Sequence, residues 1–300
     1  DFSAAIELGF FNDRLTASVN YYNHYTDQLL LENNIAPSSG FLTMTNNIGA
    51  ISNKGVDVTL GFTPIQDFER QIQWNVSING NHNKNVVKKL SNEIKKQNEN
   101  NLNERNSPAP IYEEGKSTSQ LFVVRSLGID PATGNEIFLK RNGERTFFWD
   151  GDTEPKFRGG ITSSLTWKEW SLNLGFTYQL GAYIYNQTLV DRVENVNLAY
   201  NVDRRAAKDR WRKPGDIAKY KSISYTGRAT ELSSRFVQKV NEIQFSSISV
   251  GYHFDPKKFT FLKQCKIAGI NLTGSMQDLG RLSSVKQERG TDYPFSRTVN

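Results

Sequence analysis

Cysteine is almost absent from this 300-residue sequence: Cys265 is the single one, which excludes an internal disulfide framework and a multi-cysteine metal cluster. Long apolar runs are also missing. No stretch approaches the roughly 18 to 20 apolar residues of a transmembrane helix, so a helical membrane protein is excluded. The mean hydropathy of -0.57 is that of a soluble protein. A transmembrane barrel has the same average, because its strands alternate lipid-facing apolar with lumen-facing polar residues.

Motifs for catalysis and metal binding are missing as well. The histidines are scattered and none lies in an HExxH context: His24, His82 and His253. Asp150, Asp152 and Glu154 imitate a calcium loop or a glycosidase carboxylate pair, but the glycine and terminal glutamate of an EF-hand are not there, so we interpret them as loop residues. No Gly-x-Ser-x-Gly elbow or phosphate-binding glycine loop occurs. We therefore expect no enzyme activity, no metal and no cofactor.

The formal net charge of +6 does not indicate a nucleic-acid partner. Lysine and arginine are scattered, apart from local runs at 84–96 and 204–213. No basic stripe alternates with stacking aromatic residues on one element. Solvated loops explain these charges better than nucleic-acid binding does.

The positive signal is alternation with a period of two over segments of about ten residues, the length with which a tilted strand crosses a bilayer. In residues 170–185, for example, Leu172, Leu174 and Phe176 alternate with Asn173 and Gly175. About ten strands are expected, at 2–11, 14–27, 48–62, 70–82, 118–128, 157–168, 170–185, 235–254, 264–280 and 291–299.

The connections alternate between short and long. Residues 11–14 and 167–170 form tight hairpin turns, whereas the polar stretches at about 83–117 and 186–234 are long. Outer-membrane barrels have this pattern, with short periplasmic turns and longer extracellular loops. Aromatic residues gather near strand ends, as interfacial girdles do, at Phe10-Phe11, Tyr21-Tyr22, Phe147-Phe148-Trp149, Trp167, Trp170 and Tyr183 to Tyr185. Residues 134–140 predict a small extra hairpin arm.

Several ordered motifs resemble the SusC/RagA-like TonB-linked outer-membrane proteins, a family of Bacteroidota. They cover the chain nearly from end to end: Phe10-Phe11-Asn12-Asp13-Arg14-Leu15 with Tyr21-Tyr22-Asn23, Asn47-Ile48-Gly49 with Asn53-Lys54-Gly55-Val56-Asp57, residues 151–160, Tyr200-Asn201-Val202-Asp203, Arg210-Trp211-Arg212-Lys213-Pro214-Gly215-Asp216, Ser234-Arg235-Phe236-Val237 and residues 291–298. Each motif alone is weak. The motifs occur in the same order as in the family, and this order makes the resemblance specific.

The resemblance implies an all-β fold, an antiparallel transmembrane barrel segment of about ten strands within a plugged barrel of roughly 22 strands. Because the motifs resemble the C-terminal barrel of the family, residues 1–300 are expected to be the C-terminal part of the barrel domain, a fragment in which the plug and the family's final strand are not recognisable. The implied function is TonB-dependent import of glycans or peptides across the outer membrane. The implied partners are a SusD-like surface lipoprotein, TonB acting through a plug N-terminal to the barrel, the substrate and membrane lipid.

Candidate ligand or partner residues lie in the long loops: Trp149, Asp152, Arg210, Trp211, Arg212 and Tyr220. Aromatic faces and guanidinium groups are the types enriched at interface hot spots. The alternative for 186–234 is a loop folded on itself, with Arg210 and Asp216 paired internally and Trp211 packed beneath. For the whole chain, a soluble carbohydrate-binding β-sandwich and a passive porin-like barrel are the competing classes.

Overall fold

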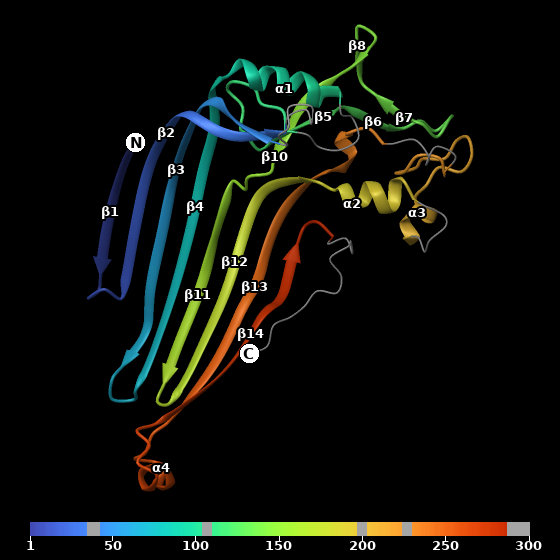
Figure 1. The fold of residues 1–300 in the computed structure, drawn as a ribbon. Helices are drawn as coiled ribbons and strands as arrows, with labels where there is room; N and C mark the ends of the chain where they lie inside the picture. The colour runs from blue at the N-terminus through green and yellow to red at the C-terminus, as the bar shows by residue number, and fades with distance from the viewer. Residues whose placement is uncertain (35–42, 104–109, 197–202, 224–229, 287–300) are drawn as a thin grey trace.

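The dominant feature of the computed structural model, which describes residues 1–34, 43–103, 110–196, 203–223 and 230–286, is one curved antiparallel sheet (Figure 1). Its eight strands, called the wall below, lie in the order β1-β2-β3-β4-β11-β12-β13-β14. They are β1 (Phe2–Phe10), β2 (Leu15–Asn34), β3 (Thr43–Asp67), β4 (Ile72–Leu90), β11 (Phe157–Trp167), β12 (Trp170–Tyr185), β13 (Val237–Phe254) and β14 (Ile270–Ser283). Each strand pairs with its predecessor among these eight, so the wall is an up-and-down meander.

The two ends of the wall differ in their connections. At the lower end in Figure 1, tight turns join Phe10 to Leu15 and Trp167 to Trp170, and the short helix α4 (Thr260–Gln264) precedes β14. Asn12 and Asp13 hold φ values of 55° and 61° in the first of these turns. Their short polar side chains tolerate this left-handed conformation.

The upper end carries two insertions, residues 91–156 and 186–236, whose described parts we call the cap (Figure 1). Its elements are α1 (Asn92–Asn103), β5 (Gln120–Val124), β6 (Ser126–Ile129), β7 (Glu136–Phe138), β8 (Lys140–Arg141), β9 (Glu144–Arg145), β10 (Phe147–Asp152), α2 (Gln187–Leu189), η2 (Val190–Glu194), α3 (Arg204–Lys208) and η4 (Ser234–Phe236). The larger buried apolar cluster lies here, around Val190, Val193 and Phe236. No described helix has the length and apolar character needed to cross a membrane.

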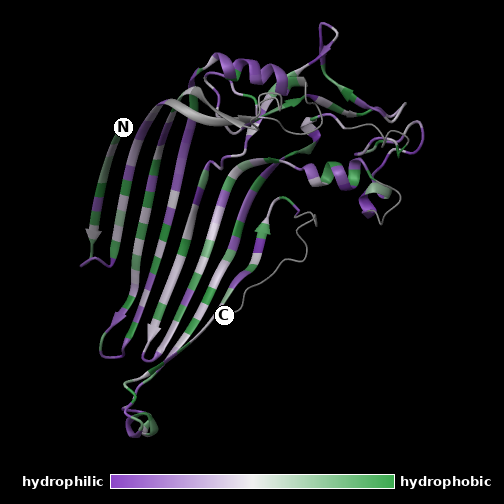
Figure 2. Ribbon diagram, viewed as in Figure 1, coloured by the Kyte–Doolittle hydropathy of each residue, from purple (hydrophilic) through white to green (hydrophobic). Residues whose placement is uncertain are grey.

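The pairing register places the alternating apolar residues of all eight strands on one face. One cross-strand row contains Ile78, Ile161 and Phe176, and continues to Phe245. The next positions along the strands, such as Ser77, Thr162 and Gly175, lie on the other face. Figure 2 shows the resulting banding along each strand. The apolar face is open: Ile6 is 64% exposed and Leu272 63% exposed, an area that only lipid or protein could cover.

Bulges keep the apolar set on this face where the spacing in the sequence changes. In β13 the apolar positions shift from odd to even numbers, from Ile243 and Phe245 to Ile248 and Val250. The register shifts between Phe245 and Ser247 at the same point. Because an extra residue reverses the side-chain alternation, the bulge returns Ile248 to the apolar face.

Most of the predicted strands are confirmed, with three corrections. Segment 118–128 is not a wall strand, since it forms β5 and β6, which pair with β10 and β7 in the cap. Residues 83–90 continue β4 and residues 92–103 are helical, where a loop was expected. Phe147 to Trp149 lie in the cap rather than at a girdle. The arm at 134–140 is confirmed by the β6–β7 hairpin, and the expected strand 291–299 falls outside the described residues.

A glycine contact gives a first prediction about the wall. The Tyr178 hydroxyl donates to the Asn79 carbonyl oxygen at 2.9 Å, and a β-carbon at position 159 would lie 1.9 Å from that oxygen. We expect Gly159→Ala to lower the free energy of unfolding of the folded protein in detergent by about 1–3 kcal/mol, because the strands must separate.

Gly274→Ala is the matched control, since a β-carbon there meets nothing within 4 Å. Urea midpoints measure both variants. Equal midpoints for the two would contradict this packing of β4 against β11.

Candidate functional site

The polar face of the wall carries a hydrogen-bonded ladder of side chains. Asn81 Nδ2 donates to Asp57 Oδ1 at 2.6 Å and Asn20 Nδ2 donates to Asp57 Oδ2 at 3.4 Å. Tyr22 extends the ladder, since its hydroxyl accepts from Asn81 and donates to Asn83, each at 3.2 Å. The ladder crosses β2, β3 and β4, so this face is built from satisfied polar groups.

A hollow of about 730 Å³ lies against the polar face. It is lined by amides, carboxylates and guanidinium groups from six strands, among them Asp57, Asn79, Arg158, Gln179, Glu242 and Arg281. Glu242 and Arg281 form an ion pair at 3.2 Å across β13 and β14. Such a lining offers hydrogen-bond donors and acceptors to a polar solute.

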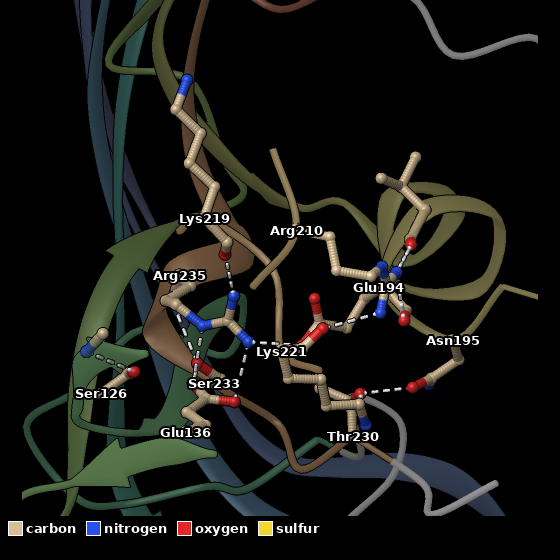
Figure 3. A network of polar contacts seen from close by, with 12 residues as sticks. Ser126, Glu136, Glu194, Asn195, Arg210, Lys219, Lys221, Thr230, Ser233 and Arg235 are labelled. Atoms are coloured by element: carbon tan, nitrogen blue, oxygen red, sulfur yellow. Dashed lines mark hydrogen bonds and ion pairs between the residues drawn. The ribbon is translucent and has the colours of Figure 1, made fainter. Parts of the chain in front are cut away.

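A buried ionic network holds the cap together (Figure 3). The Arg235 guanidinium donates from Nε to Glu136 Oε1 at 2.8 Å and from Nη2 to Glu194 Oε1 at 2.7 Å. Glu136 is in β7, Glu194 ends η2, and Arg235 is in η4 just before β13. Glu194 is fully buried, at 0% exposure. One arginine therefore ties three segments far apart in the sequence.

The protonation states of this network follow from burial and charge. Burial alone would raise the pKa of the Glu136 carboxyl, but the hydrogen bonds and charge of Arg235 hold it below its usual range. Burial lowers the pKa of Lys221, whose ammonium group donates to Thr230 Oγ1 at 2.9 Å, and Glu194 opposes that shift only in part. The two carboxyl groups thus interact with three cations inside the cap, which are Arg210, Lys221 and Arg235.

Of the predicted site residues, Arg210 and Tyr220 lie inside the cap. Arg210 is 6% exposed and donates to the carbonyl oxygens of Ala206 at 2.8 Å, Lys221 at 2.8 Å and Glu194 at 2.9 Å. Tyr220 is 7% exposed and belongs to the buried apolar cluster. Both side chains support the fold of the cap.

Trp211 and Arg212 lie nearer the surface. Trp211 Nε1 donates to the Pro131 carbonyl at 2.8 Å, while Arg212 is exposed and contacts the Ala207 carbonyl. The Arg210–Asp216 pair of the self-folded alternative is wrong, because Asp216 accepts instead from the backbone N–H groups of Arg212 and Lys213 at 3.0 and 3.1 Å. Asp216 thus closes a turn that presents Arg212 outward.

Trp149 and Asp152 form a separate group on β10. Trp149 Nε1 donates to Glu113 Oε2 at 2.8 Å, and its ring lies 4.8 Å from that of Phe122. Asp152 accepts from the Ser119 hydroxyl at 2.6 Å. These partners all belong to 113–122, whereas Arg210 to Tyr220 contact 130–134 and the second insertion. The six predicted residues therefore do not converge on one site.

Curated proteins similar in sequence are TonB-dependent receptors. The chain is 25% identical to TonB-dependent receptor P39 of Formosa agariphila, over 89% of this chain and 30% of the relative. It is 24% identical to the receptor SusC of Bacteroides thetaiotaomicron, over 84% of this chain and 25% of that protein. The solved RagAB peptide transporter superposes with a TM-score of 0.73 at 21% identity, covering 94% of this chain and 31% of that one. No family model matches.

The division of the wall into an apolar and a polar face agrees with the β-barrel fold of these similar proteins. The chain resembles TonB-dependent receptors in sequence and the RagAB transporter in fold. It spans about 30% of the curated relatives' length, and its place is the outer membrane, with strands crossing the bilayer. The competing β-sandwich is wrong, because the described strands outside the wall form two-stranded sheets in the cap rather than a second layer over the apolar face.

Some residues of this SusC/RagA-like segment were not singled out from the sequence. The network of Glu136, Glu194 and Arg235 joins positions up to 99 residues apart in the sequence. No local sequence pattern predicts such a contact. The polar residues that line the hollow, in contrast, can be found from the sequence. All of those named except Arg281 occupy the polar phase of a predicted strand, so alternation and register together identify them.

Proposed function

We propose that this chain forms part of the wall and the extracellular cap of a TonB-linked importer of glycans or peptides. The observation that carries the proposal is the division of the wall into an apolar face and a polar face with its own hollow. The apolar face contacts lipid, and the polar face lines the lumen. The long insertions place the cap outside the cell and the tight turns in the periplasm. The homologues are receptors, and we propose that this segment acts without catalysis.

In this proposal residues 1–300 are the C-terminal part of the barrel domain. TonB acts through a plug N-terminal to them, and a SusD-like lipoprotein covers the cap. The name of RagAB states a peptide cargo for that transporter, whereas SusC-like importers as a class include glycan importers. The polar lining of the hollow suits hydroxyl groups and peptide groups alike.

The cap gives the second prediction, on partner binding. We expect Trp211→Ala combined with Arg212→Ala to weaken capture of the lid lipoprotein and growth on the cognate nutrient by about tenfold or more, the size expected for interface hot spots. Both residues lie on the turn closed by Asp216. Pull-down of the lipoprotein and growth rate measure the effect.

Arg141→Ala is the matched control, because it removes an exposed arginine from another part of the cap. Trp211→Phe separates partner binding from cap folding, since it keeps an aromatic ring against the 130–134 turn and loses the hydrogen bond to Pro131. If the double variant reaches the surface normally and both readouts match wild type, this turn does not bind the partner.

A further inference from the structure

The apolar face of the wall changes chemistry close to the cap. One cross-strand row contains Tyr21, Val56 and His82. The row one step nearer the cap on the same face contains Asn23, Lys54 and Lys84. Lys54 and Lys84 are directly opposite each other on β3 and β4, and both are exposed. Cations thus replace apolar side chains within a single step along the strands.

A third lysine lies beside this row. The carbonyl of Lys156 contacts His82 Nδ1 at 2.5 Å, and the ring of the following residue, Phe157, lies 5.2 Å from that of His82. Lys84 and Lys156 also line one hollow of about 420 Å³ beside the start of β11, together with Lys116. Lys84, Lys116 and Lys156 thus line one concave site, and Lys54 lies directly opposite Lys84 on the neighbouring strand.

The carboxylates at this hollow already have partners. Asp152 accepts from Ser119 and from the Glu154 N–H at 2.6 and 3.0 Å, and Glu154 pairs with Arg158 at 3.3 Å. Within the described ranges, no carboxylate pairs with Lys54, Lys84 or Lys156. Like charges directly opposite in a sheet are unfavourable. An anion between them would remove that cost.

We propose that Lys54, Lys84 and Lys156 bind the phosphate groups of lipid headgroups in the outer leaflet. Aromatic residues such as Tyr21 and Phe157 mark the interface between hydrocarbon and headgroups. Lys54 and Lys84 lie one row beyond Tyr21, and Lys156 directly precedes Phe157. Phosphate groups of anionic lipids attract such cations at the membrane surface. This inference goes beyond import and depends on the apolar face contacting lipid, not on the cargo.

The test uses the full-length receptor purified in neutral detergent. Wild type is expected to bind phosphatidic acid in preference to diacylglycerol, which has the same tails without the phosphate. Lys54→Gln, Lys84→Gln and Lys156→Gln together should weaken phosphatidic acid binding by about a hundredfold, since each lysine near a membrane surface contributes about fivefold. Native mass spectrometry and equilibrium titration measure the bound lipid.

The control is Lys257→Gln, Lys263→Gln and Lys266→Gln, which removes the same charge around α4 at the opposite end and should leave binding unchanged. Equal lipid binding by wild type and the first triple variant would overturn the proposal. So would lysine-dependent binding of inorganic phosphate without any of the lipid. Import is measured separately in cells, so loss of import with intact lipid binding counts against the proposed function alone.

Discussion

Phe176→Asp is expected to block assembly of most of the protein, whereas Thr177→Asp at the next position assembles. Phe176 lies near the middle of β12 on the apolar face and stacks on Phe245 with ring centroids 4.6 Å apart. A carboxylate facing lipid costs up to about 2 kcal/mol at mid-depth, and loss of the ring pair costs about 1 kcal/mol more. Thr177 lies on the polar face and lines the lumen-side hollow, where water solvates a new charge.

The measurement is the heat-modifiable, membrane-inserted fraction of the full-length protein, compared at equal expression. Phe176→Leu is the volume-tolerant control and should assemble like wild type, because leucine is also apolar. Equal assembly of the two aspartate variants would show that neither face contacts lipid, whereas poorer assembly of Thr177→Asp would show that the faces are assigned the wrong way round.

Arg235→Met is expected to unfold the cap while the wall remains. The guanidinium contacts both Glu136 and the fully buried Glu194. Removing one partner of a buried ionic network leaves the remaining charges buried without compensation, which lowers the free energy of unfolding by about 3–5 kcal/mol. Limited proteolysis and hydrogen exchange over 186–236 should report the loss, and Arg141→Met, at an exposed site, should leave protection intact. An Arg235→Met cap that resists protease as wild type does would contradict the role of the network.

The same network makes the cap sensitive to acid. The folded pKa of Glu136 is lowered from its usual 4.5, so its stabilising contribution is fully present above about pH 4.5 and is lost as the pH falls through the folded pKa. Protection of 186–236 in wild type should therefore decrease on acidification below pH 4.5. Arg235→Met removes the favourable partner of Glu136, and this component of the pH dependence should disappear with it.

The wall was predictable because its signal is local. Each strand repeats a two-residue period, and even the bulge in β13 is visible where Phe245 and Ile248 break that period. The period does not say which sheet a strand joins, so 118–128 was assigned to the wall although it pairs in the cap.

The cap was less predictable because its contacts are distant. An arginine in a polar loop has the same local sequence whether it meets a partner, as expected of Arg210, or bonds buried carbonyls, as Arg210 does. Nothing near Glu136 in the sequence indicates that it meets Arg235.

The difference between tight turns at one end of the wall and long insertions at the other has an evolutionary consequence. One residue added within a wall strand reverses every later side chain unless a bulge absorbs it. A segment added at the cap end changes the register of no strand, as the insertion between β4 and β11 shows, since those strands pair directly across it. Descendants of a common ancestor can therefore gain, lose or exchange whole cap segments while they inherit the same wall. The surface that the cap presents then changes through changes in length at one end of the protein, without redesign of the wall.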